Sequence, residues 1–185
     1  MLRRLLLVVV FGFTSLGNVH AHEAAVRPLT LEDRPLLELL RAPSVPPPIP
    51  SGTTALRFAQ FFRTPAGPRG LEPTETLLRL DRHRVRLFGY MVLNDAPQPG
   101  VLLLSAMPIT LAEQADGAAD DLPSAVVTVR LPPALAGRVV PFVPGILMVE
   151  GQLGVGARDE PDGRRSMVRL QLDWPALTAV PGVVK

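Results

Sequence analysis

The chain has 185 residues, among them 19 lysines and arginines, 17 aspartates and glutamates, and no cysteine. The lack of cysteine excludes a thiol nucleophile, a redox Cys-x-x-Cys pair and a cysteine-ligated zinc site, and because Lys185 is the only lysine, covalent lysine chemistry is excluded in the interior. The sequence also has no nucleophile elbow, phosphate loop or dinucleotide fingerprint, so we expect a non-catalytic protein.

Residues 1–21 have the pattern of a secretory signal peptide. Two arginines precede a short apolar run at 5–13, and a polar stretch with small residues ends at Ala21. A membrane-spanning helix needs roughly 20 apolar residues, which this run does not reach. We therefore predict cleavage after Ala21 and a mature chain that begins at His22 and is periplasmic or secreted. An uncleaved membrane anchor is the alternative.

Cleavage changes the charge balance. The signal peptide contains Arg3 and Arg4 but no acidic residue, so 19 basic side chains become 17, equal to the 17 acidic ones. A chain with no net charge does not have the generally basic surface that nucleic-acid binding requires. We expect the partner to be an envelope protein or an anionic surface, with no nucleic acid and no transmembrane segment after cleavage.

Residues 22–52 are predicted to form an N-terminal arm. A short helix with a leucine stripe at 36–40 begins after the capping residue Asp33 and ends before Pro43. We expect it to pack on its own domain, and partner binding is the alternative. The proline-rich segment, residues 43–52, is predicted to be an extended linker.

The main domain is predicted to span residues 53–175 and to be followed by a tail at 176–185. It should begin with a docking helix at 53–63, capped by Thr53 or Thr54. The apolar face of this helix would consist of Leu56, Phe58, Phe61 and Phe62.

Five stretches with β-strand character follow the docking helix. They lie within residues 77–94, 100–110, 124–131, 146–156 and 166–174. In the first, Val85 and Leu87 alternate with arginines, and Gly89 is placed for a bulge or bend. Pro161, Asp162 and Gly163 predict a hairpin turn between the last two strands.

Five strands with turns between them predict a mainly β fold, a small OB-like barrel preceded by one or two short helices. Closing the sheet into a barrel removes its exposed edges. A β-sandwich is the alternative, but five strands are few for one.

Residues 77–173 resemble a group of uncharacterised bacterial exported proteins that have an OB-like barrel and are known only as a domain of unknown function. The shared positions are structural glycines and apolar residues: Leu80, Val85, Gly89, Tyr90, Met91, Val149, Gly151 and Leu153. The resemblance implies this fold and export, and it implies no reaction. Many members of the group have a cysteine and a proline run in the middle loop, where this chain reads ADGAADDLP, so no metal or redox role is carried over.

The acidic residues of that loop are Glu113, Asp116, Asp120 and Asp121. Carboxylates can ligate calcium, but their spacing here does not match a calcium-binding loop. The adjacent Asp120 and Asp121 would point to opposite sides of an extended chain, which does not suit a glycosidase pair. We predict a solvated loop between two strands.

The densest positive patch contains Arg82, Arg84 and Arg86, with Arg79 and His83 beside them. We predict that Arg82, Arg84 and Arg86 bind the anionic partner, because a barrel surface can hold acidic groups with such a patch. A solvated strand face is the alternative, since alternation alone explains Arg84 and Arg86.

A copper-binding periplasmic protein is the alternative function. After cleavage, the imidazole and the new α-amino group of His22 could chelate one copper ion, with His83 as a second ligand. The arginines on both sides of His83 oppose the approach of a cation, so we expect no cofactor in the main hypothesis.

Overall fold

A computed structural model of the protein describes residues 27–28, 38, 40–67, 70–111, 113–114, 117–118, 122–123 and 125–173. The strands in this part are β1 (Arg27–Pro28), β2 (Thr53–Ala55), β3 (Arg84–Met91), β4 (Leu93–Asn94), β5 (Val101–Ser105), β6 (Thr110–Leu111), β7 (Glu113–Gln114), β8 (Gly117–Ala118), β9 (Val127–Arg130), β10 (Arg138–Val139), β11 (Ile146–Asp159) and β12 (Arg165–Leu172). The helices are α2 (Glu75–Arg79) and two single 3-10 turns, η2 (Phe58–Gln60) and η3 (Pro133–Leu135), and Glu38 and Leu40 are helical as well. The described fold is mainly β, as predicted.

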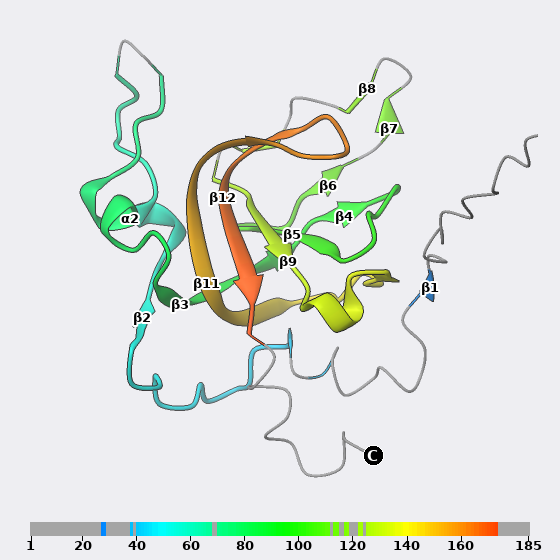
Figure 1. Ribbon diagram of the computed structural model, residues 1–185, viewed down its shortest axis with the longest axis horizontal. Helices are drawn as coiled ribbons and strands as arrows, with labels where there is room; N and C mark the ends of the chain where they lie inside the picture. The colour runs from blue at the N-terminus through cyan, green and yellow to red at the C-terminus, as the bar shows by residue number, and fades with distance from the viewer. Residues whose placement is uncertain are drawn as a thin grey trace, which may run out of the picture.

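Five strands pair in a ring. The circuit runs β3–β5–β9–β12–β11 and returns to β3, and all its pairings are antiparallel except β9–β12, which is parallel. Figure 1 shows β11 and β12 as a long curved hairpin in front of β9 and β5. Each strand of the ring contains or overlaps one of the five predicted stretches, and the turn at 160–164 joins β11 to β12, so the predicted hairpin is confirmed.

The interior of the ring is the hydrophobic core. Alternate residues of the strands point inward and are fully buried, among them Val85, Leu87, Val129, Leu153 and Leu170. Burying one such side chain stabilises the fold by about 1.5–3 kcal/mol. The same alternation places the other residues of each strand on the outer face of the ring.

The prediction of a docking helix at 53–63 is wrong. Residues 53–55 form β2, which pairs with β3 in parallel, and residues 58–60 form only the 3-10 turn η2. Leu56 and Phe61 are nevertheless buried in the core, because a tight turn also brings closely spaced apolar residues to one side. The predicted apolar contact is therefore present without the predicted helix.

A short helix, α2, lies where only strand was expected. The side chain of Thr74 caps it, with its hydroxyl oxygen accepting from the backbone N–H of Leu77 at 3.1 Å. Leu77 is fully buried. Figure 1 shows α2 beside β2 and the start of β3, so the helix ends close to the strand that it precedes.

Gly89 permits a close approach and does not form the predicted bulge. β3 and β11 remain in register through this position. A Cβ atom on Gly89 would lie 2.6 Å from the carbonyl oxygen of Ser105 and 2.9 Å from the ring of Phe58. Only glycine leaves room there for β5 and η2 to pack against β3.

The N-terminal arm contacts the ring. Leu40 is buried in the core, as expected of a helix that packs on its own domain, and the backbone N–H of Ala42 donates to the carbonyl of Ile146 at 2.9 Å. In the proline-rich segment, the carbonyls of Pro47 and Pro48 accept hydrogen bonds from Arg86. This segment is thus held against β3.

Within the ranges that the structure describes, no helix has the length and apolar character needed to cross a bilayer. Residues 1–21, on which the signal-peptide prediction rests, lie outside those ranges.

Candidate functional site

A cleft with a volume of about 350 Å³ lies on the outer face of β9, β12 and β11. We call it the arginine cleft, because its lining includes the four arginines Arg82, Arg130, Arg158 and Arg169. Asp81, Gln152, Gly154 and Gln171 also line it. A volume of a few hundred Å³ suits a small ligand or one group of a larger one.

Strand register places these residues together. Gln152 and Gln171 are paired across β11 and β12, and Gln171 is paired with Arg130 across β12 and β9. Gly154 is paired with Arg169 in the same way. These positions alternate with buried core residues, so they share the outer face of the ring.

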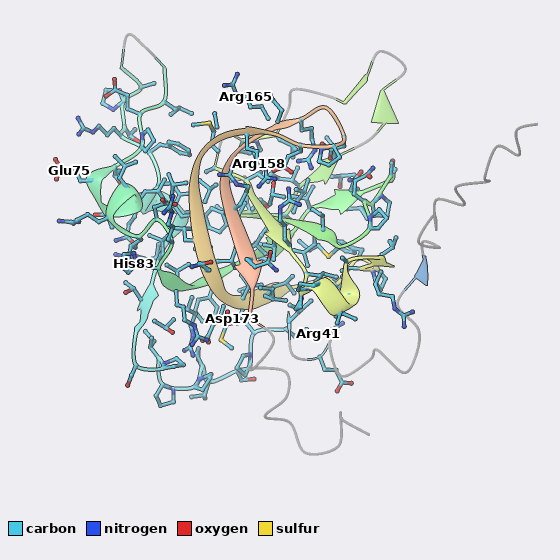
Figure 2. The ribbon with its side chains drawn as sticks, viewed as in Figure 1. Arg41, Glu75, His83, Arg158, Arg165 and Asp173 are labelled. Atoms are coloured by element: carbon cyan, nitrogen blue, oxygen red, sulfur yellow. The ribbon has the colours of Figure 1, made fainter. Side chains whose placement is uncertain are left out.

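A register shift in the β11–β12 hairpin sets the position of Arg158 beside the cleft. The register of β11 and β12 shifts between Val155 and Arg158, and within this bulge Gly156 has a φ of 119°. Glycine adopts such a φ without the steric cost that a side chain would add. Figure 2 shows Arg158 near the turn end of the hairpin, while Asp173 lies at the other end of β12.

The buried carboxylate of Glu160 binds one of the cleft arginines, Arg130. The side chain of Glu160 is 3% exposed, and one of its oxygens accepts from Nη2 of Arg130. Its other oxygen accepts from the hydroxyl of Ser166. Both carboxylate oxygens are therefore engaged inside the fold, and a buried pair of this kind needs such additional hydrogen bonds.

Arg169 is fixed through one end of its guanidinium. Nη1 donates to the carbonyl of Gly156 at 2.7 Å, to the hydroxyl of Ser166 at 3.0 Å and to the carbonyl of Ser166 at 3.3 Å. Burial lowers the pKa of Arg169, the nearby Arg158 and Arg130 lower it further, and Glu160 and Asp81 act in the opposite direction. The charges around Arg169 are therefore of both signs, and an anion in the cleft would further favour its charged form.

The turn before β3 closes one side of the cleft. Asp81 accepts from the backbone N–H of Val155 at 2.8 Å, and Gln152 donates to the carbonyl of Arg82 at 3.0 Å. Arg82 has a φ of 62°, which is unfavourable for a residue with a long side chain. Its side chain is 88% exposed, so its guanidinium is accessible at the edge of the cleft.

The structure separates the three arginines of the predicted patch. Arg84 forms an ion pair with Asp173 at 2.8 Å, and its side chain is 45% exposed. Arg86 is buried, with its guanidinium donating to Glu150 and to two proline carbonyls. Arg86 is thus occupied by internal contacts, while binding by Arg82 and Arg84 stays a prediction.

The structure describes only some of the candidate metal ligands. His22, Asp116, Asp120 and Asp121 lie outside the described residues, and only the backbone of Glu113 is described, in β7. Nδ1 of the exposed His83 lies 2.9 Å from the carbonyl oxygen of Asp81. Among the residues whose side chains are described, no three His, Asp or Glu residues gather as a metal site would require. The copper hypothesis therefore stays a prediction.

Sequence reasoning missed Arg130, Arg158 and Arg169 because they are far apart in the chain and none belongs to a dense cluster. A weak signal was present, since Arg169 and Gln171 occupy the polar positions of an alternating strand. That signal does not reveal that β9 lies beside β12, because the two strands are separated by β10 and β11.

The fold and the cleft describe a mainly β protein with an arginine-lined surface site. No family model matches the chain, and no curated protein matches it. Among solved structures, it is similar to the crystal structure of a DUF3299 family protein from Pseudomonas aeruginosa PAO1, with 16% identity, a TM-score of 0.41, and coverage of 65% of this chain and 93% of that one. That family, like the group that residues 77–173 resemble, is one of unknown function. A similarity of this size assigns no ligand or activity to this chain.

Proposed function

We propose that the protein is an exported, non-catalytic binding module of the bacterial envelope that holds an anionic group of its partner in the arginine cleft. The observation that carries the proposal is the convergence of four arginines from different segments on one cleft. Two carboxylates balance the four arginines only in part: among the described residues, Asp81 is the one acidic residue of the lining, and Glu160 pairs with Arg130.

Two further features support the proposal. The signal-like pattern of residues 1–21 supports export. The strand order of the ring supports an OB-like barrel. Around the ring the strands follow the order β3, β5, β9, β12, β11, which are the first, second, third, fifth and fourth ring strands in the chain. Only β9 and β12, the third and the fifth, pair in parallel. Barrels of this kind commonly use their outer surface and loops to bind ligands.

The arginine cleft can be tested with two matched variants on the same hairpin. Arg158 lines the cleft and its side chain donates no hydrogen bond to another described residue, whereas Arg165 is exposed on the neighbouring strand outside the lining. Figure 2 shows both side chains near the turn end of the hairpin. Arg158→Ala should elute from immobilised heparin, a general polyanion, at a lower salt concentration than Arg165→Ala, because only the first variant removes a charge from the cleft.

Both substitutions change the net charge by the same amount, so a difference between them reports on the cleft and not on overall charge. Thermal unfolding should show that both variants remain folded, since each replaces an exposed side chain. Equal elution of the two variants would contradict the proposal that the arginine cleft is the binding site.

A further inference from the structure

The two ends of the Arg169 guanidinium differ in their surroundings. Nη1 is held by the three acceptors described above. Every hydrogen bond that the Arg169 guanidinium makes within the described part of the chain comes from this atom, so Nε and Nη2 keep their N–H groups available. A guanidinium fixed at one end loses little further side-chain entropy when its other edge binds a ligand.

Gly154 keeps the free edge of Arg169 uncovered. A Cβ atom at this position would lie 3.7 Å from Nε and 3.8 Å from Nη2, which is ordinary van der Waals contact. A larger side chain there would extend over both atoms. Gly154 lies in the middle of β11 and does not have the positive φ that would itself require glycine. The effect of glycine at this position is therefore to leave the space above Arg169 open.

The Nε and Nη2 groups of an arginine form a fork that matches two oxygens of one oxoanion. Arg130 and Arg158 lie close enough to Arg169 to lower its pKa. One guanidinium would suffice for a singly charged carboxylate. Arg130 is already paired with Glu160, but Arg158 has no acidic partner among the described residues. This additional charge favours a group that carries up to two negative charges, as a phosphate monoester does.

We propose that the arginine cleft binds a phosphate monoester, with two phosphate oxygens accepting from Nε and Nη2 of Arg169, while Arg158 balances the remaining charge. This inference rests on the proposed function and identifies the ligand class for the same cleft. The phosphate could belong to a small soluble molecule or to a lipid headgroup, and the two sources share this chemistry.

The first experiment is calorimetric titration of the protein with glycerol phosphate, and with acetate at equal ionic strength. Wild type should bind glycerol phosphate more tightly than acetate. Gly154→Val should weaken phosphate binding at least about tenfold, because loss of one charge-assisted hydrogen bond already has roughly this effect. Gly137→Val is the matched control, since Gly137 has open space around it and lies outside the cleft lining; its affinity should equal that of wild type.

Arg169→Lys provides a second variant that keeps the charge and removes the fork. It should weaken glycerol phosphate binding by about as much as Gly154→Val, because a lysine ammonium cannot donate from two fixed parallel N–H groups. Unchanged affinity in a folded Gly154→Val variant, or equal affinity of wild type for phosphate and acetate, would overturn the inference.

The source of the phosphate is distinguished with vesicles. If the ligand is a lipid headgroup, the protein should sediment with vesicles containing phosphatidic acid, and glycerol phosphate should release it. If the ligand is soluble, glycerol phosphate should bind and the vesicles should not.

When Arg158→Ala weakens heparin binding but neither phosphate probe binds wild type, the proposed function stands and this inference fails. When Arg158→Ala and Arg165→Ala behave alike on heparin, the proposed function itself fails.

Discussion

Gly151→Ala should lower the free energy of unfolding by about 3 kcal/mol or more, toward the upper end of what overpacking a core costs. Gly151 is buried in β11 and is paired with Leu172 of β12. A Cβ atom there would lie 2.0 Å from the carbonyl oxygen of Gln171 and 2.8 Å from its carbonyl carbon. These are backbone atoms, so the two strands would have to separate to admit a methyl group.

Gly154→Ala is the matched control for this prediction, because the same substitution three residues along β11 meets no atom closer than 3.7 Å. It should leave stability unchanged or raise it by about 0.5–1 kcal/mol, since alanine loses less backbone entropy than glycine on folding. Urea unfolding followed by circular dichroism measures both variants. Equal stability of the two would show that β12 does not lie against Gly151 as closely as the structure places it.

Glu150→Ala is expected to destabilise the protein by about 3–5 kcal/mol, the cost of leaving a buried charge without its partner. The partner is Arg86, whose side chain is 4% exposed, and that of Glu150 is 11% exposed. After the substitution, the carbonyls of Pro47 and Pro48 would be the only acceptors left to Arg86 among the described residues. Neutral carbonyls cannot replace a carboxylate as a counter-charge in a poorly solvated position.

Asp173→Ala is the control for Glu150→Ala. It also removes an acidic partner of a β3 arginine, but the ion pair with Arg84 is partly exposed, and pairs of this kind contribute up to about 1 kcal/mol. The double variant Arg86→Met with Glu150→Leu should recover most of the lost stability, because apolar side chains of similar size often replace a buried ion pair at little cost. A Glu150→Ala variant as stable as Asp173→Ala would contradict the buried pair.

The Arg86 contacts also change how the proline-rich segment is understood. From sequence it is predicted to be a linker, because prolines favour an extended chain without internal hydrogen bonds. Extended proline-rich chain leaves its carbonyls free, and here two of them satisfy the donors of a buried arginine. A residue predicted to bind a partner therefore binds a segment of its own chain.

The sequence by itself determined the strands, because alternation of apolar and polar residues is a local property that burial on one face imposes. Val85 and Leu87 in β3 and Leu170 and Leu172 in β12 show this pattern directly, and the glycine and proline between Asp159 and Arg165 indicate the hairpin turn. The spacing of apolar residues predicted the wrong element where more than one local structure is compatible with it. Phe58 and Phe61 fit one face of a helix, but a 3-10 turn also brings both to the core, with Phe61 buried and Phe58 half-buried. Helix α2 is too short to show a helical period.

Only the tertiary structure decided which strands are neighbours, and the candidate site depends on that. Pairing of β9 with β12, which are separated in sequence by β10 and β11, brings Arg130 beside Gln171 and close to Arg169. The physical reason is that a strand's own residues fix which side chains point outward, whereas the closure of the whole sheet fixes which outward side chains meet. Tertiary structure likewise buried Arg86 and left Arg158 accessible, although both are arginines on strands of the same ring.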